Sequence, residues 1–317
     1  MNKGIEGLVK LLTEANDAYR AGKPVISDNE YDKLVETLKR DDPENEWFKK
    51  AVQDKAPADR KEKLPIPMYS LEKVKSFEEI TRWIKSLQLE DLDELIVTAK
   101  YDGISLCVQE IVGDAWTRGD GEYGQNCVEH LKHLKNRHWM PSDYDQLCFT
   151  FGEAIFTTDD FLRIKFEAGY KSARNAAAGL INSPEISPYL KDVSYVRYGC
   201  DREDWDKKKQ LDFLNEASSS SISNHKTKYV VITARSLAEE TSFKNFMNSL
   251  FEKLSVGFKC DGLVIDVNNA KKRQELGRLP NGNPRYAIAY KDPDWSEREE
   301  TVVKGVRWQI SKDGRLA

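Results

Sequence analysis

The chain has 317 residues, 39% of them hydrophobic and 32% charged, with a formal net charge of −4. That size accommodates one large domain or a large and a small one, and the composition is typical of a globular protein with a solvated surface. No signal peptide or membrane helix is apparent, and five scattered cysteines argue against a disulfide framework or a four-cysteine zinc site. The acidic balance predicts weak DNA binding by this chain alone, and we expect a cytoplasmic location.

The first forty residues are expected to form two helices. Apolar residues from Leu8 to Tyr19 recur at helical spacing. Ser27 and Glu30 have the spacing of a capping box, and the apolar stripe of a second helix follows from Tyr31 to Leu38. We therefore predict a small helical hairpin domain over residues 1–62, whose charged end from residue 49 onward is a boundary segment.

From Pro65 onward strand patterns dominate, with helical stretches between them. Such an order predicts an α+β domain with largely antiparallel sheets and interspersed helices over residues 63–300. Gly113-Asp114 is a hairpin turn signal inside this region. The expected strands are Leu95–Ala99, Ile104–Val112, Ala115–Arg118, Phe149–Phe156, Tyr195–Cys200, Tyr229–Thr233 and Gly262–Val267, and the expected helices are Asp159–Ala168, Asp206–Ala217 and Ser242–Leu254.

Two short patterns do not favour the sites they usually indicate. Gly119 to Gly124 matches Gly-x-Gly-x-x-Gly, but a predicted hairpin precedes it and no βαβ unit follows, which argues against a dinucleotide-binding turn. The pattern is still compatible with a glycine-rich loop beside a phosphate site. His130, His133 and His138 lack acidic or cysteine partners at zinc-binding intervals, so we expect a solvated helix face there.

Lys100 is the strongest candidate for a reactive group. It begins the run Lys100-Tyr101-Asp102-Gly103, where one predicted strand gives way to the next. A lone lysine at a strand end would be ordinary. Here further charged residues follow at strand ends downstream, which favours an amine that attacks phosphorus among groups that bind a nucleotide. Those residues are Arg118, Glu153, Asp261 and Lys291.

Several longer segments, in their order along the chain, carry a family resemblance. Together with the hairpin and its Ser27-Asp28-x-Glu30-Tyr31-Asp32, they resemble the NAD-dependent DNA ligases of the covalent nucleotidyltransferase superfamily, over roughly residues 5–317. The segments are Pro67–Leu71, Lys100–Gly103, Thr117–Gly121, Gly152-Glu153, Ala173–Gly179, Asp261–Ile265 and Tyr286–Lys291.

The resemblance implies a reaction with NAD. Lys100 would attack the adenylyl phosphorus of NAD, release nicotinamide mononucleotide (NMN) and form Lys-AMP, for transfer to the 5′-phosphate of nicked DNA. Attack requires the uncharged amine, a form that burial and neighbouring cations such as Lys291 and Arg118 favour. The same cations would neutralise charge on the phosphoryl oxygens. The implied cofactors are NAD and Mg²⁺.

The resemblance also implies roles for individual residues. Asp102 would orient the lysine or assist a metal, Glu153 would accept a ribose hydroxyl, and Asp261 would hold water or Mg²⁺, with Asp266 a second possible metal ligand. The remaining nucleotide-binding positions are Thr98 and Gly103 near the lysine, Ser70 and Leu71 flanking adenine, and Asp28, Tyr31 and Asp32 at the nicotinamide end.

Several positions depart from the family pattern. Thr98 replaces the acidic residue that usually reads adenine, and Asp266 replaces a lysine, which places an anion where a phosphate-facing cation is expected. We expect Lys253, Lys304 or Lys312 to supply the missing charge. The other departures are Phe151 and Asn182 for arginines, and Ala18-Tyr19 for a Tyr-His pair.

We expect an active NAD-dependent enzyme in which the residues that bind phosphate are rearranged. The departures leave two alternatives to that interpretation. One is the adenylation domain of an ATP-dependent DNA or RNA ligase, whose families lack the hairpin. Another is a non-catalytic scaffold that binds NAD or a partner subunit. Residues 301–317 resemble the start of an OB-fold that is cut short, so nick sealing is expected to need further C-terminal domains or a second subunit.

Overall fold

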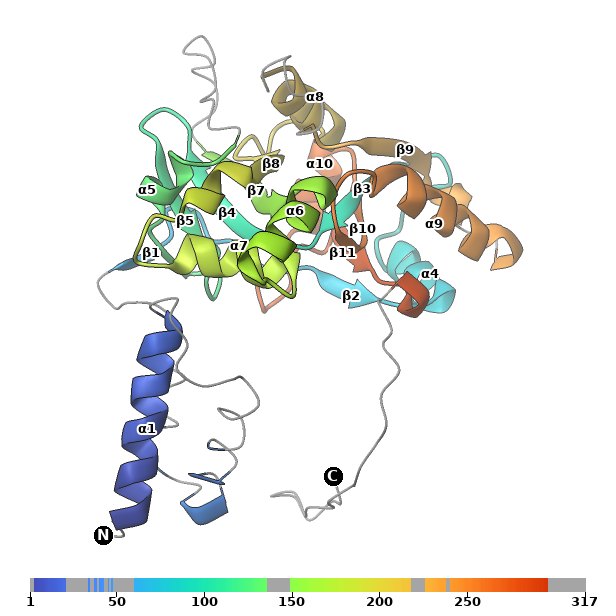
Figure 1. Ribbon diagram of the computed structural model, residues 1–317. Coiled ribbons are helices and arrows are strands. Elements are labelled where there is room, and N and C mark those ends of the chain that lie inside the picture. The colour runs from blue at the N-terminus through green and yellow to red at the C-terminus, as the bar shows by residue number, and fades with distance from the viewer. Residues whose placement is uncertain are drawn as a thin grey trace.

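The computed structural model describes residues 3–20, 60–135, 149–217, 226–237 and 240–295, together with 34, 37–38, 40–42, 45 and 47. Within these ranges it is a mixed α+β protein with largely antiparallel sheets, which confirms the predicted fold class (Figure 1). None of the helices in these ranges has the length and apolar character that crossing a bilayer requires.

The larger sheet has five strands in the order β2-β11-β10-β3-β9. Each neighbouring pair is antiparallel except β11 and β2, which run parallel. Strand β3 lies beside β10 although the two are far apart in the sequence, and this pairing brings Lys100 opposite Gly262. The strands are β2 (Glu72–Val74), β3 (Glu94–Tyr101), β9 (Tyr229–Thr233), β10 (Cys260–Val267) and β11 (Ala287–Tyr290).

The second sheet has four antiparallel strands in the order β5-β4-β7-β8. A separate two-stranded ribbon pairs β1 with β6. Strand β1 falls inside the charged segment that we expected to be a boundary between domains. The strands are β1 (Lys61–Lys63), β4 (Ile104–Gln109), β5 (Asp114–Thr117), β6 (Tyr123–Gln125), β7 (Phe149–Phe156) and β8 (Val193–Cys200).

Helices cover the sheets, and their ends follow local sequence signals. Helix α6 begins after Thr157, whose side chain accepts a hydrogen bond from the Asp160 backbone, and it ends at Gly169 with φ 73°. All three helices expected in this region are present with ends shifted by two residues or fewer. The helices are α4 (Phe77–Ser86), α5 (Val128–Leu131), α6 (Thr158–Ala168), α7 (Ala173–Asn182), α8 (Lys207–Ala217), α9 (Glu240–Leu254) and α10 (Ala270–Leu276), with 3₁₀ turns at Pro188–Asp192, Ala234–Leu237 and Pro293–Trp295.

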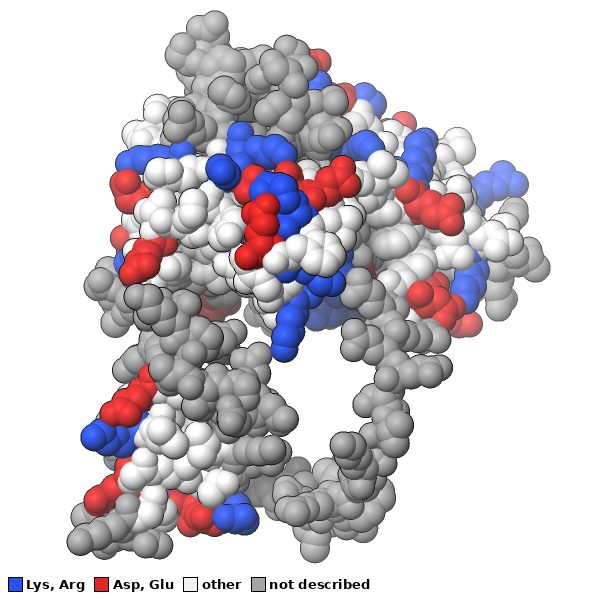
Figure 2. All heavy atoms as spheres, viewed as in Figure 1, with Lys and Arg blue, Asp and Glu red and all other residues white. Residues whose placement is uncertain are grey.

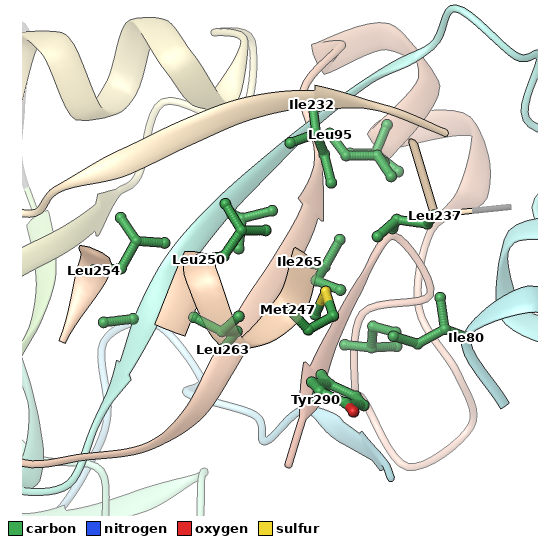
Figure 3. Packing of buried hydrophobic residues seen from close by; sticks show 14 of the residues in the cluster. Ile80, Leu95, Ile232, Leu237, Met247, Leu250, Leu254, Leu263, Ile265 and Tyr290 are labelled. Atoms are coloured by element: carbon green, nitrogen blue, oxygen red, sulfur yellow. The ribbon is translucent and has the colours of Figure 1, made fainter. Parts of the chain in front are cut away.

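The main hydrophobic core lies between α9 and one face of the five-stranded sheet (Figure 3). Met247 and Leu250 of α9 face Leu263 and Ile265 of β10 in this core. A second core lies between the four-stranded sheet and helices α6 and α7. Since successive strand residues alternate between faces, packing one face of the larger sheet leaves its other face to form a site.

The N-terminal helix α1 (Lys3–Arg20) confirms the first helix of the predicted hairpin. Its residue Leu12 is fully buried in a small cluster with Leu38 and Trp47. Residues 21–33 lie outside the described part of the chain, and so do Asp28, Tyr31 and Asp32. Residues 296–317 also lie outside it, and they include residues 301–317, where we expected the start of an OB-fold.

The core between β10 and α9 can be tested with one truncation. Leu263 is fully buried in the central strand, so Leu263→Ala is expected to lower the free energy of unfolding by about 2–5 kcal/mol in urea titrations. Leu162→Ala on α6, where the side chain is 51% exposed, serves as control and should change stability by about 0.5 kcal/mol or less. Equal losses for the two variants would contradict this packing.

Candidate active site

Lys100 lies on the face of β3 that is turned away from the main core. Leu95, Val97 and Ala99 belong to the core cluster, so the alternate residues Thr98 and Lys100 lie on the other face. Lys100 is near the end of β3, and its register partner in β10 is Gly262. The predicted nucleophile is therefore placed at a strand end beside Asp261.

Asp261 contacts two lysines at once. Its Oδ1 is 3.1 Å from Lys100 Nζ, and Lys291 Nζ, from the end of β11, donates a hydrogen bond to its Oδ2. About a quarter of each of these three side chains is exposed. A carboxylate between two ammonium groups offsets their mutual repulsion in a partly buried place. The structure thus brings together three of the four predicted catalytic residues.

Two glycines allow the strands around the site to approach closely. A Cβ on Gly103 would lie 2.4 Å from the Ala154 carbonyl oxygen, and one on Gly262 would lie 2.4 Å from the Tyr290 carbonyl oxygen. Any side chain at either position would therefore push the neighbouring strand away. The Asp-Gly pairs in the sequence keep Glu153 and Lys291 close to Lys100.

Glu153 is buried beside the lysine. Its two oxygens accept hydrogen bonds from the Gly103 backbone, at 3.2 Å, and from the Ser105 hydroxyl, at 2.9 Å. Burial raises the pKa of Glu153 to about 7, although the Ser105 hydrogen bond and the charges of Lys100 and Arg118 oppose that shift. Glu153 is therefore poised to exchange a proton near neutral pH.

Asp102 pairs with a residue absent from our predicted site. Arg174, at the start of α7, lies 2.8 Å from an Asp102 oxygen, and the Asp102 backbone donates a hydrogen bond to the Lys259 carbonyl oxygen. Half of the Arg174 side chain is exposed, so this ion pair contributes little to stability. It does hold the Asp102 carboxylate toward α7, while Asp261 is the carboxylate that contacts Lys100.

Sequence reasoning also missed Ser105 and Tyr198. The Tyr198 hydroxyl is hydrogen-bonded to Ser105, and burial raises the pKa of Tyr198 above its ordinary range. Both residues are polar groups at alternating positions of otherwise apolar strands, a signal that was present in the sequence. Together with Glu153, they are the side chains that the four-stranded sheet places at the site.

The other predicted nucleotide-binding residues lie on neighbouring segments. Thr98 is buried two positions before Lys100 on the same face of β3. Ser70 is exposed and Leu71 is half-buried in the stretch that leads directly into β2. Arg118 follows β5, and its backbone donates a hydrogen bond to the Ser105 carbonyl oxygen, at 2.9 Å.

Asp266 lies apart from the lysine pair. One of its oxygens is 3.8 Å from Lys207 Nζ and the other is 3.4 Å from Arg273 Nε. Among the described residues these two cations are its ion-pair partners. Lys304 and Lys312, two of the lysines expected to supply the missing phosphate-facing charge, lie outside the described ranges.

Two further sequence patterns lie within the described residues. The Gly119–Gly124 segment contains the tight turn between β5 and β6, where the Asp120 carboxylate accepts a hydrogen bond from the Tyr123 backbone. The prediction of a solvated histidine face is wrong for His130, which is 2% exposed and contacts the Ser183 carbonyl oxygen. The described residues contain no group of three or more metal-ligating side chains, and His138 lies outside them.

Surface charges near α6 and α7 are mixed in sign. Figure 2 shows acidic and basic side chains next to one another on this face of the molecule. Arg163 of α6, for example, contacts Asp192 at 2.6 Å and Asp160 at 3.9 Å. Among the side chains that the structure describes near α6 and α7, charges of both signs are therefore interspersed.

The raised pKa of Glu153 predicts a pH dependence of stability. Between pH 4.5 and about 7 the unfolded carboxyl is ionised while the buried one keeps its proton, so the wild type loses stability as pH rises through that window. Glu153→Gln removes this loss, so its stability relative to wild type should rise by about 3 kcal/mol between pH 4.5 and 7.5. Urea unfolding at several pH values measures this; a constant difference would contradict the assignment.

Comparison with known proteins is consistent with this geometry. Residues 59–294 match the family model of the NAD-dependent DNA ligase adenylation domain. A DNA ligase of Acanthamoeba polyphaga mimivirus is 31% identical over 308 residues, which are 94% of this chain and 44% of that protein. A DNA ligase of Neorickettsia sennetsu is 28% identical over 318 residues, covering 96% of this chain and 45% of that protein.

The chain thus spans a little under half the length of these two relatives. Among solved structures, an archaeal ATP-dependent RNA ligase aligns with a TM-score of 0.41 and 10% identity, over 71% of this chain and 48% of that one. Because the family model covers well over half of the sequence and the two-sheet fold brings the Lys100 motif together with Asp261 and Lys291, the chain belongs to the NAD-dependent DNA ligase adenylation domain family.

Proposed function

We propose that Lys100 is adenylylated by NAD. The Nζ lone pair forms a bond to the adenylyl phosphorus, and the bond between that phosphorus and the bridging oxygen of the pyrophosphate breaks. The bonding electrons leave on the phosphate of NMN, and the product is Lys-AMP. The observation that carries this proposal is the position of Lys100 between Asp261 and the buried Glu153, with Lys291 beside it.

Asp261 is the group best placed to manage the proton of the nucleophile. Attack requires Lys100 to lose a proton, and the Asp261 carboxylate is 3.1 Å from the amine. Lys291 is bonded to the same carboxylate and adds positive charge where phosphoryl oxygens would enter. Once those oxygens approach the two ammonium groups, they compete with Asp261 for both contacts.

The residues also fit a magnesium ion bound mainly by substrate phosphates. Mg²⁺ is commonly held by one or two carboxylates, water and phosphate oxygens. We propose Asp261 as the protein ligand, because its carboxylate lies 3.1 Å from Lys100 Nζ, whereas Asp266 lies beside Lys207 and Arg273. When bound, Mg²⁺ would supply charge neutralisation at the phosphates.

Glu153 is proposed to bind a ribose hydroxyl of the nucleotide. It stands beside Ser105 and Gly103 with a pKa near 7, so it accepts or donates a hydrogen bond according to its protonation. Tyr198, bonded to Ser105, presents a half-buried ring next to this position.

The adenylate would then pass to the 5′-phosphate of nicked duplex DNA, in replication or repair. Because the chain covers about half of its relatives' length, we propose that sealing requires further domains or a second subunit. We likewise propose a cytoplasmic location, since this chemistry requires access to NAD and DNA.

The first test measures covalent transfer. Protein incubated with Mg²⁺ and NAD labelled in the adenine ring should retain label after denaturation, and Lys100→Ala should abolish it. Lys165→Ala, which alters an exposed lysine of α6, is the control and should label as wild type does. Label that survives Lys100→Ala would reject this nucleophile, and an unlabelled wild type would favour the non-catalytic scaffold.

The second test separates NAD from ATP as the adenylate donor. The resemblance assigns Tyr31 to the nicotinamide end, so Tyr31→Ala should slow labelling from NAD by at least about tenfold, the loss expected for one aromatic-cation contact. Labelling should be weak from ATP in both proteins. Equal labelling from ATP and NAD, unaffected by Tyr31→Ala, would instead support the ATP-dependent alternative.

A further inference from the structure

A compact loop between α10 and β11 contacts the segment that leads into β2. In this loop, residues 277–285, Arg278 forms a β-bridge with Pro284, and the Gly282 backbone donates a hydrogen bond to the Leu279 carbonyl oxygen, at 2.8 Å. Gly282 has φ 83°, a left-handed conformation that favours glycine. The chain thus folds back on itself, and we call this element the 277–285 loop.

Glu72, the first residue of β2, is hydrogen-bonded to two side chains of this loop. Its Oε1 accepts hydrogen bonds from the amides of Asn281, at 3.0 Å, and Asn283, at 2.7 Å. These bonds lower the pKa of Glu72, so the carboxylate is ionised at neutral pH and both hydrogen bonds are charge-assisted. The start of β2 is therefore tied to both sides of Gly282, which lies between the two asparagines.

Tyr69, three residues before Glu72, packs against the same loop. A Cβ on Gly282 would overlap two atoms of the Tyr69 ring, so the ring rests directly on the glycine backbone. The Arg278 guanidinium lies 5.4 Å from the ring centroid and donates a hydrogen bond to the Gly282 carbonyl oxygen, at 3.3 Å. The two residues between Tyr69 and Glu72 are thus flanked along the chain by contacts with the loop.

Those two residues, Ser70 and Leu71, are also connected to Lys291. Strand β2 runs parallel to β11 (Figure 1), and the Lys291 backbone donates a hydrogen bond to the Val74 carbonyl oxygen, at 2.9 Å. Three residues separate Leu71 from Val74, which corresponds to about 10 Å in an extended chain. A nucleotide whose phosphorus lies at Lys100 and Lys291 would have its base within reach of Leu71.

We propose that the 277–285 loop holds Ser70 and Leu71 in the position in which they contact the base of the bound nucleotide. Glu72 and the side chains hydrogen-bonded to it are positioning residues, because they act through this segment. With the loop in place, binding does not have to order the segment first, so less affinity is lost to conformational entropy. The inference rests on the proposed function, since it takes the phosphorus to lie at Lys100.

This role predicts an effect that depends on the base of the ligand. Adenosine monophosphate (AMP) carries both a base and a phosphate, whereas ribose 5-phosphate carries the phosphate without the base. Loosening the loop should weaken binding of AMP and leave ribose 5-phosphate unchanged, because the smaller ligand has no group to contact Ser70 or Leu71. Partial unfolding of the protein would weaken binding of both ligands alike.

The first test measures both affinities by calorimetry in variants of Glu72. The wild type should bind AMP more tightly than ribose 5-phosphate. Glu72→Ala removes the acceptor of both amide hydrogen bonds and should lower this affinity ratio about fivefold or more, the loss expected when side chains must be ordered on binding. Glu72→Gln is the matched control. The two bonds share one oxygen in the wild type, and the Gln amide oxygen can accept both, so this variant should keep most of the ratio.

Gly282→Ala is an independent test through the contact with Tyr69. An added Cβ would displace the Tyr69 ring, so the ratio should fall as it does in Glu72→Ala. Its control is Gly169→Ala at the end of α6, where φ is 73° and a Cβ would meet no atom within 4 Å. The control imposes similar backbone strain away from the loop and should keep the wild-type ratio.

Equal wild-type affinities for the two ligands, no binding of AMP, or wild-type ratios in both Glu72→Ala and Gly282→Ala would overturn the inference. The measurement involves no covalent step, so Lys100→Ala should lose labelling by NAD and keep the ratio. Labelling at Lys100 with a ratio that neither loop variant changes would remove the inference alone. A ratio that falls in those variants, in a protein that NAD never labels, would remove the proposed reaction alone.

Discussion

The Asp261 carboxylate holds two ammonium groups that come from different strands. Lys100 approaches one oxygen from β3 and Lys291 the other from β11, in surroundings where only about a quarter of each side chain is exposed. Without the carboxylate, two cations this close would repel each other and turn outward. Asp261 therefore keeps two positively charged groups close together, and one of them is Lys100, the proposed nucleophile. The rest of the fold serves to keep these three groups in one place.

The two faces of the larger sheet have different roles, because successive residues of a strand point to opposite faces. One face of β3 and β10 packs against α9 in the core. The other face carries Thr98 and Lys100 of β3 and Gly262 and Asp266 of β10. Gly103 and Gly262 stand where adjacent strands must come too close for a side chain. The packed core thus fixes the strands whose opposite face carries the candidate site, and the proposed attack on phosphorus requires such fixed positions.

Much of this arrangement follows from local sequence pattern, and some of it does not. Strands β7 and β9 have the predicted bounds because apolar, β-branched and aromatic residues concentrate in them. Strands β1 and β2 were not predicted. Each is three residues long and largely exposed, so an alternating apolar and polar pattern cannot be recognised in it. His130 looked solvated by spacing and is buried, because its backbone acceptor at Ser183 comes from a distant segment.

The candidate site, too, could be predicted only in part from the sequence. Lys100, Asp261, Glu153 and Lys291 were predicted from their places at strand ends and from the family resemblance. Their proximity depends on the pairing of β3 with β10, which no local pattern specifies. Arg174 at Asp102, and Lys207 and Arg273 at Asp266, are contacts between helices and strands that only tertiary packing creates.

The most direct measurement of the central claim locates the covalent bond itself. After reaction with NAD and Mg²⁺, peptide mapping by tandem mass spectrometry should find one AMP on the peptide that contains Lys100, attached at Nζ through an acid-labile phosphorus–nitrogen bond. An adduct on any other side chain, or one that withstands acid as a phosphate ester would, contradicts the account.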